Sequence, residues 1–292
     1  MTKAKSRVDR IKYYIDNYNN LPEENVSEQN KTIDEESIKE RMKKVRLLCL
    51  VPTGPTHFLT RDSAVKQTWG KRCDILLFMT AKADPFLPTV GLNITEGWKY
   101  LTSKTMAAFR YVLKNHFDDA DWFMKVDDDT FVIVENLRYF LASHNTEEPV
   151  FYGHHYSYFV KQGYNGGGAG YVLSKEALRR FGKLKYNECR EEGGAEDLEM
   201  GKCMEKIGVV PGRTLDAFDR LRFHTYSAES HVTGALPTWV IDYDAYGIKK
   251  GVENASDRAI SFHYTKPHAL YESEFFIYSF RPHGNRIRHN AM

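Results

Sequence analysis

The sequence predicts an α/β fold with a mostly parallel central sheet flanked by helices. Between residues 45 and 145, short apolar runs typical of buried strands alternate with segments of helical apolar spacing. The chain has 292 residues, of which 42% are hydrophobic, and this is enough to build a sizeable core. Three adjacent carboxylates, Asp127–Asp129, directly follow one of the apolar runs. Ligands of such sheets bind beyond the carboxyl ends of the strands, so this run marks a candidate site.

The first half of the chain supplies the predicted sheet. Its first apolar run ends at the turn-forming sequence Pro52-Thr53-Gly54-Pro55. Within 96–115, apolar side chains recur three and four residues apart, which is typical of an amphipathic helix. In order, we expect a strand at 45–51, a helix at 60–69, a strand at 74–80, a helix within 96–115, a strand at 121–126 and a helix at 135–143. This alternation favours parallel strands joined by crossover helices.

The second half of the chain is less regular. The segment 164–171 is rich in glycine and is predicted to form a loop. After it we expect a short strand, helices at 174–181, 195–207 and 267–280, and a last strand at 259–264. The stretch 212–251 has many aromatic residues but no clear period, so we expect loops there.

These elements divide the chain into a polar stem or flexible arm at 1–43, a globular domain at 44–283 and a polar tail at 284–292. We expect the arm to be partly helical from 33 to 44. No stretch approaches the ~20 apolar residues of a membrane span, and the first residues lack the apolar core of a signal peptide. The sequence as written therefore predicts a soluble chain. A net charge of +2 argues against nucleic acid or an anionic membrane surface as the main partner.

Four cysteines favour an oxidising compartment, because their even count fits two disulfides and their spacing matches no zinc site. Proximity along the sequence favours the pairs Cys49–Cys73 and Cys189–Cys203. Four buried thiols are the alternative. Glycosylation sequons at Asn25, Asn30, Asn93 and Asn254 add modest support, since such short motifs also arise by chance.

The run Asp127–Asp129 is the strongest functional signal. Adjacent carboxylates repel one another, and a bound divalent cation is the usual compensation because hard cations take oxygen ligands. A calcium-binding EF-hand loop starting at Asp127 would need glycine and glutamate where this chain has Val132 and Arg138. The alternative is a solvated acidic turn, although the flanking apolar runs fix the carboxylates at a sheet edge.

Three further sites are weaker when taken alone. The glycine-rich segment is not a dinucleotide fingerprint, because Tyr171 occupies the third glycine position; it is either a tight turn or a close backbone approach to a ligand. Glu196-Asp197 is either a pair favoured by a helix dipole or a general base at the mouth of a pocket. His263 lies in an apolar strand and is a core residue unless it faces the Asp run, where imidazole suits Mn²⁺ or Zn²⁺ but not Ca²⁺.

Five motifs, in the right order, resemble a known family. They are Thr68–Cys73, Val126–Phe131, Gly167–Ser174, Glu196–Gly201 and Ser261–Tyr264. Together they resemble the inverting β1,3-glycosyltransferases of the Fringe-like group, and within it the core 1 β1,3-galactosyltransferases. The resemblance covers roughly residues 45–283. It implies a GT-A fold for the predicted globular domain.

The resemblance also implies a reaction and its residues. Galactose would pass from UDP-galactose to the 3-hydroxyl of O-linked GalNAc on a glycoprotein or glycopeptide, with Mn²⁺ as cofactor. The metal would be held by Asp127, Asp129 and His263, and Asp197 would be the catalytic base. The nucleotide-sugar residues would be Thr53, Arg61, Lys104, Asp127, Asp128 and His263. The acceptor residues would be Trp239, Tyr243 and Gly168.

This chemistry suits the residue types. A divalent metal neutralises the charge that develops on the UDP leaving group. A carboxylate removes the proton from the acceptor hydroxyl as that hydroxyl attacks the anomeric carbon from the opposite face. One displacement through an oxocarbenium-like transition state inverts the anomeric centre, so we expect no covalent nucleophile.

The chain departs from the core 1 pattern in three places. These enzymes carry an aromatic cluster where this chain has the segment 237–243, in which Trp239 keeps a face that can stack on a sugar. They carry a Cys-Cys pair where this chain has the segment 253–257, which contains no cysteine. Family members are type II membrane proteins of the Golgi lumen, and no anchor is visible here. The sequence is compatible with a homodimer. The alternative functions are a β1,3-glycosyltransferase with another donor or acceptor and a non-catalytic chaperone-like paralogue, which need not keep the Asp run or the base.

Overall fold

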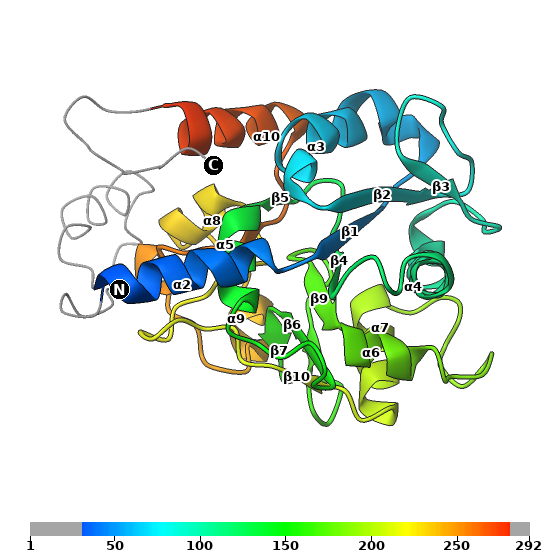
Figure 1. The fold of residues 1–292 in the computed structure, drawn as a ribbon. Coiled ribbons are helices and arrows are strands. Elements are labelled where there is room, and N and C mark those ends of the chain that lie inside the picture. The colour runs from blue at the N-terminus through cyan, green and yellow to red at the C-terminus, as the bar shows by residue number, and fades with distance from the viewer. Residues whose placement is uncertain (1–30, 281–292) are drawn as a thin grey trace, which may run out of the picture.

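The computed structural model describes residues 31–280. The predicted tail at 284–292, the first 30 residues of the predicted arm and the sequons at Asn25 and Asn30 lie outside the described residues. Figure 1 shows a central sheet with helices on both of its sides. The fold is therefore mixed α/β, as the alternation of strand and helix patterns predicts.

Seven strands form the central sheet, in the order β10-β6-β9-β4-β1-β2-β3. Their bounds are β1 Leu47–Pro52, β2 Ile75–Thr80, β3 Thr89–Gly91, β4 Trp122–Lys125, β6 Val150–Gly153, β9 Tyr171–Ser174 and β10 Val210–Pro211. Parallel pairs join β1 to β2 and β4, β2 to β3, and β6 to β10, whereas β9 runs antiparallel to both β4 and β6. The sheet is mostly parallel, and the predicted strands at 45–51, 74–80 and 121–126 form its β4-β1-β2 part.

Helices cover both faces of the sheet. Successive side chains of β1 point to opposite faces, and because all of them are apolar, both faces need a covering layer. Leu47, Cys49 and Val51 pack toward one helical layer, and Leu48 and Leu50 pack toward the other. The first layer contains α3 (Ser63–Gln67), α5 (Val134–Leu141) and α10 (Pro267–Glu274). The second contains α4 (Leu101–Asn115), α6 (Lys175–Phe181) and α7 (Glu196–Lys206). Every residue of β1 is buried, as expected for a strand between two layers.

A small second sheet joins two segments that are distant in the sequence. It contains β5 (Phe131–Val132), β11 (Phe223–His224) and β12 (Ser261–Phe262). β5 follows the Asp run and pairs antiparallel with β12, which precedes His263. The backbone N–H of Thr265 also donates to the carbonyl of Asp129, at 2.7 Å. This pairing fixes His263 beside the Asp run. A separate two-stranded ribbon consists of β7 (His155–Tyr156) and β8 (Tyr164–Asn165).

Three secondary-structure predictions need correction. The predicted helix at 267–280 is divided into α10 and a π-helical segment at Phe275–Ser279. The predicted helix at 60–69 is divided into a π-helical turn at Phe58–Asp62, α3, and a 3₁₀ turn at Trp69–Arg72. The stretch 212–251, predicted as loops, contains α8 (Ala228–Thr233) and α9 (Thr238–Tyr243), so that prediction is wrong. These helices are too short for apolar periodicity to reveal them. The capping residues of α8 were the available signal: the side chain of Ser227 accepts from the N–H of Ser230, and Gly234 has a φ of 65°.

Both predicted disulfides are present. Cys49–Cys73 joins β1 to the segment before β2, and Cys189–Cys203 joins a loop to α7. Of the two sequons in the described part, Asn93 is exposed, whereas the Asn254 side chain is 2% exposed and so is buried in this fold.

The described end of the predicted arm is helical. Helix α2 (Lys31–Lys43) contacts α5, in front of which it crosses in Figure 1. Across residues 31–280, no helix has both the length and the apolarity that crossing a membrane requires.

Candidate active site

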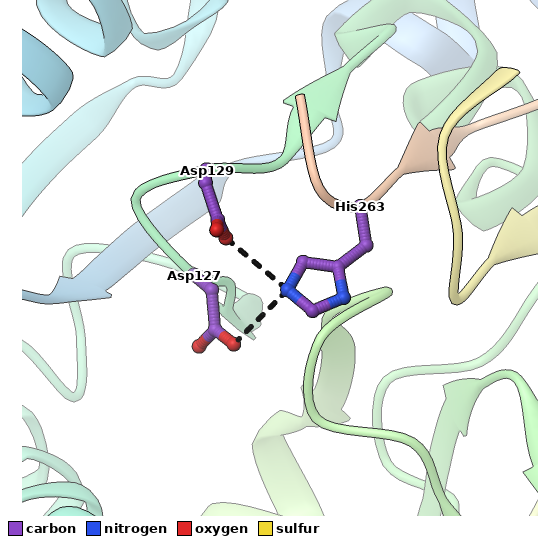
Figure 2. A group of neighbouring side chains, drawn as sticks. All are labelled: Asp127, Asp129 and His263. Atoms are coloured by element: carbon purple, nitrogen blue, oxygen red, sulfur yellow. Dashed lines mark ion pairs between the residues drawn. The ribbon is translucent and has the colours of Figure 1, made fainter. Parts of the chain in front are cut away.

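Three side chains from two distant segments converge beyond the end of β4. Asp127 and Asp129 lie on the turn between β4 and β5, and His263 directly follows β12 (Figure 2). The Nε2 atom of His263 lies 3.1 Å from Oδ1 of Asp129 and 3.8 Å from Oδ2 of Asp127. One ligand atom of each residue lies within 4.8 Å of the other two, which suits a single divalent cation. We call these three residues the metal triad; the described chain brings no second such group together.

The surroundings of His263 decide which ring nitrogen faces the carboxylates. Its Nδ1 lies 3.3 Å from the carbonyl oxygen of Thr225, which leaves Nε2 directed at Asp127 and Asp129. Burial by itself lowers the pKa of His263, but the hydrogen bond to Asp129 and the two negative charges outweigh it and raise that pKa. A cation would take the place of this proton between the same groups. Two carboxylates and one imidazole fit Mn²⁺ or Zn²⁺.

The middle residue of the run points away from the triad. Asp128 is buried, and its carboxylate contacts His57 at 2.6 Å, Arg61 at 2.8 Å and Thr53 at 3.0 Å. Burial raises the pKa of Asp128, but the hydrogen bonds and charges of His57 and Arg61 outweigh it, so the pKa lies below its ordinary value. Asp128 therefore lies in a separate cluster, together with two of the residues predicted to bind the nucleotide sugar.

Lys104 reaches the same cluster from α4. Its Nζ donates to the carbonyl of Thr53 and to Oε2 of Glu96, the latter at 2.5 Å, and the residue is 3% exposed. The predicted residues Thr53, Arg61 and Lys104 thus lie near one another, beyond the ends of β1 and β4. His57 and Glu96 belong to this cluster and were not predicted: His57 meets Asp128 across 71 positions of the chain, and the contact of Glu96 with Lys104 follows no motif.

Asp197 lies on the first turn of α7, against the glycine-rich segment. Its Oδ2 accepts a hydrogen bond from the N–H of Gly167 at 3.0 Å, and the side chain is half-buried. The next glycine touches the metal triad, because a Cβ at Gly168 would lie 2.2 Å from Nδ1 of His263. A Cβ at Gly167 would lie 2.8 Å from Oε2 of Glu196. The glycine-rich segment therefore approaches side chains of the candidate site closely, and its approach to a ligand stays a prediction.

Lys125, the last residue of β4, lies beneath this site and was not predicted. It is 3% exposed; its Nζ donates to Oδ1 of Asp127 at 2.7 Å and lies 3.1 Å from Oε2 of Glu196. Glu196 also accepts from the hydroxyl of Tyr171, at 2.7 Å. Burial raises the pKa of Glu196, whereas for Lys125 the charges of Asp127 and Glu196 outweigh burial and raise its pKa. The available signal was a lysine inside an otherwise apolar strand.

Aromatic side chains extend outward from the metal triad. The ring of His263 stacks on Tyr264 with centroids 3.9 Å apart, and Tyr264 contacts Tyr226 at 5.2 Å. Tyr226 contacts Trp239 at 6.3 Å, and Trp239 contacts Tyr243 at 5.9 Å. The predicted acceptor residues Trp239 and Tyr243 both lie on α9 and are connected to His263 through these rings. Trp239 is 42% exposed, so part of its ring is free to stack on a ligand.

Comparison with known proteins now identifies the family. The model of the Fringe-like family matches residues 44–233. The chain belongs to the Fringe-like family. The matched part of this Fringe-like protein includes the Asp run, the glycine-rich segment and Asp197, and it ends before Trp239 and His263.

Relatives of this Fringe-like protein are named as glycosyltransferases. Glycoprotein-N-acetylgalactosamine 3-beta-galactosyltransferase 1 of Xenopus laevis is 39% identical over 92% of this chain and 76% of its own length. Beta-1,3-glucosyltransferase of Mus musculus is 31% identical over 58% of this chain and 35% of its own length. A solved glycosyltransferase involved in glycosylation of the major capsid of PBCV-1 aligns with a TM-score of 0.32 and 13% identity, over 46% of this chain and 62% of its own; a score this low carries no inference. The family and these relatives identify the protein as a glycosyltransferase.

Proposed function

We propose that this Fringe-like protein is an inverting, Mn²⁺-dependent β1,3-galactosyltransferase. It transfers galactose from UDP-galactose to the 3-hydroxyl of O-linked GalNAc on glycoproteins. One observation carries the proposal: Asp197 contacts Gly167, and His263 of the metal triad contacts the adjoining Gly168. A candidate base and a candidate metal site thus share one short stretch of backbone, as a single-displacement transfer needs. The name of the Xenopus laevis relative supports the choice of donor and acceptor.

The metal triad and the neighbouring cations suit the diphosphate of the donor. Bound Mn²⁺ would neutralise the charge that develops on the UDP leaving group. The triad offers two carboxylates and Nε2 of His263 as ligands. Arg61 lies between the two halves of this region, because its Nη1 is 2.8 Å from Asp128 and 3.5 Å from Asp129. About a third of its side chain is exposed, so the guanidinium is accessible to a phosphate oxygen.

Asp197 acts as the general base in this proposal. Its Oδ2 accepts from Gly167, and its Oδ1 accepts from the N–H of Leu198 at 2.8 Å, so the carboxylate is held in one orientation. It removes the proton of the acceptor hydroxyl as this oxygen attacks the anomeric carbon. The leaving UDP takes the electron pair of the broken bond, and the sugar inverts in one step.

Trp239 and Tyr243 supply the acceptor surface. The exposed ring of Trp239 suits stacking against the apolar face of a sugar, and its contacts with Tyr226 and Tyr243 fix its position. We extend the proposal to the lumen of the Golgi, because the two disulfides are typical of an oxidising compartment.

The test is a transfer assay with UDP-galactose and a GalNAc-α-Thr glycopeptide, in Mn²⁺ and in EDTA. We expect Galβ1-3GalNAc in Mn²⁺ and no product in EDTA. If UDP and Mn²⁺ bind but no product forms, the donor or acceptor is wrong, and a β1,3-glycosyltransferase of other specificity takes its place. If UDP does not bind at all, the chaperone-like alternative is favoured.

A further inference from the structure

We propose, on the basis of the function proposed above, that Lys125 is a positioning residue that couples the metal triad to the start of α7. It touches no reacting atom. It acts through Asp127 on the metal side and through Gly167 and Glu196 on the side of the candidate base.

The three donors of the Lys125 ammonium are all used inside the protein. Nζ lies 2.7 Å from Oδ1 of Asp127, 3.1 Å from Oε2 of Glu196 and 3.3 Å from the carbonyl oxygen of Gly167. A lysine has three N–H donors, so these three acceptors satisfy it completely. Because the residue is 3% exposed, the ammonium is a fixed internal cation and is not a ligand-binding group.

On the metal side, Lys125 decides which oxygen of Asp127 faces the triad. Oδ1 accepts from Lys125, and Oδ2 lies 3.8 Å from Nε2 of His263. The Asp127 side chain is 31% exposed, so without this bond its terminal torsion would be free to turn. Partners that orient a metal ligand typically change metal affinity by about 10- to 100-fold when they are removed.

On the other side, the same ammonium holds the segment that carries the candidate base. It contacts the carbonyl of Gly167, whose N–H donates to Asp197. It also contacts the buried carboxylate of Glu196, the residue before Asp197, which the hydroxyl of Tyr171 holds from another direction. Nζ of Lys125 therefore fixes the metal triad and the segment that carries Asp197 relative to each other.

A purely structural role must be separated from this one, because Lys125 could serve only to neutralise Glu196. Two variants make the separation. Lys125→Met removes the cation and leaves Glu196 buried with no opposite charge in contact, which is strongly destabilising. In Lys125→Met/Glu196→Gln the buried negative charge is removed as well, while glutamine still offers an oxygen to the Tyr171 hydroxyl. The double variant therefore removes the unpaired buried charge but still lacks the hydrogen bond that orients Asp127.

The experiment measures Mn²⁺ binding at saturating UDP by titration calorimetry, together with the melting temperature, for the wild type and both variants. We expect the double variant to recover most of the melting temperature that Lys125→Met loses. We expect it still to bind Mn²⁺ roughly 10- to 100-fold more weakly than the wild type. Lys175→Met is the matched control: this lysine pairs with Asp118 near the start of β4, away from the triad, and its loss should leave Mn²⁺ binding unchanged.

Wild-type Mn²⁺ affinity in the double variant would overturn the proposal and reduce Lys125 to a counter-charge. Turnover adds a second readout: at saturating Mn²⁺ we expect kcat of the double variant to stay roughly tenfold or more below the wild type, because Gly167 and α7 have lost their anchor. Full recovery of kcat would overturn the coupling to α7. A wild type that binds UDP and Mn²⁺ but transfers no galactose would overturn the proposed function alone, and the comparison of Mn²⁺ affinities would still decide the role of Lys125.

Discussion

At the scale of single residues, the run Asp127–Asp129 shows how three adjacent carboxylates can coexist at a strand end. Each has its own partner, so the mutual repulsion is compensated separately. The partners are Lys125 for the first, His57 and Arg61 for the second, and His263 for the third. As a result, the first and third carboxylates face one point while the second is buried on another side.

The proposed role of Asp197 as the base predicts that binding and turnover respond differently to its replacement. We expect Asp197→Asn to bind UDP and Mn²⁺ like the wild type and to lose about 10²- to 10⁴-fold in kcat, because an amide cannot accept the proton. Stopped-time transfer assays and UDP titrations measure the two quantities. Asp118→Asn, at a side chain that is 90% exposed, is the control and should leave both unchanged. Substantial residual turnover in Asp197→Asn would remove this residue from the role of base.

The contact between Gly168 and His263 predicts that a single methyl group disturbs the metal site. In Gly168→Ala the new Cβ would lie 2.2 Å from the His263 ring, so the ring cannot keep its present position beside the carboxylates. We expect Mn²⁺-dependent UDP binding to weaken by roughly tenfold or more. Gly247→Ala is the control: its Cβ meets nothing within 4 Å, so the cost is limited to about 1–2 kcal/mol of backbone strain at a φ of 74°. Equal Mn²⁺ affinity in Gly168→Ala and the wild type would show that the ring tolerates the methyl group.

At the scale of secondary-structure elements, α8 is joined to the second sheet through two buried imidazole rings. His231 on α8 lies almost perpendicular to His224 on β11, with ring centroids 4.5 Å apart. Within the described chain, neither ring nitrogen of His231 has a hydrogen-bond partner. Burial lowers the pKa of both side chains, that of His224 to about 3. The folded protein therefore holds both rings in the neutral form.

This pair predicts acid sensitivity with a defined sign. Between about pH 6.5, where histidines of the unfolded chain titrate, and about pH 3, the unfolded state binds more protons, so the free energy of unfolding falls as pH falls. His231→Phe keeps a ring and removes one of the two groups. We expect melting temperatures at pH 8 and pH 5 to differ less in this variant than in the wild type, corresponding to about 2 kcal/mol less destabilisation at pH 5. The exposed His268 provides the control, His268→Phe. An unchanged pH dependence in His231→Phe would contradict the assignment.

At the scale of the whole molecule, the site exists because two sheets meet at it. The central sheet delivers the Asp run at the end of β4, and the pairing of β5 with β12 delivers His263. The disulfide Cys49–Cys73 ties β1 to the segment before β2, and Cys189–Cys203 ties a loop to α7, which carries Asp197. Ligands that bind this junction should therefore stabilise the entire fold.

The linkage between ligand binding and folding is measurable as a thermal shift. UDP at about 100 times its dissociation constant adds about 2.7 kcal/mol to the free energy of unfolding of a protein that binds it only when folded. We expect UDP to raise the melting temperature by several degrees in Mn²⁺ and by much less in EDTA. Asp129→Ala should lose this metal dependence, whereas Asp118→Ala should keep it. A shift in EDTA equal to that in Mn²⁺ would mean that the nucleotide binds without the triad.

Several features of this fold depend only on neighbours along the chain and could be predicted from them. Continuous apolar runs predict the strands at 45–51, 74–80 and 121–126, and helical spacing predicts the helix within 96–115, because each pattern reports which side chains one element buries. Proximity in the sequence also gave the correct disulfide pairs. Short elements escaped prediction: α9 has six residues, which is fewer than two helical turns, and the four residues of β6 are all buried and so show no alternation.

Which side chains of the site face one another depends on long-range packing. The turn of Asp128 toward His57, the bridge from Lys125 to Glu196 and the passage of Gly168 beneath His263 all join segments that are far apart in the chain. Such contacts depend on which strands are neighbours in a sheet, and local periodicity does not encode strand order. The residue types therefore predicted a cation site and a base, and the packing of the two sheets decided how those residues are arranged.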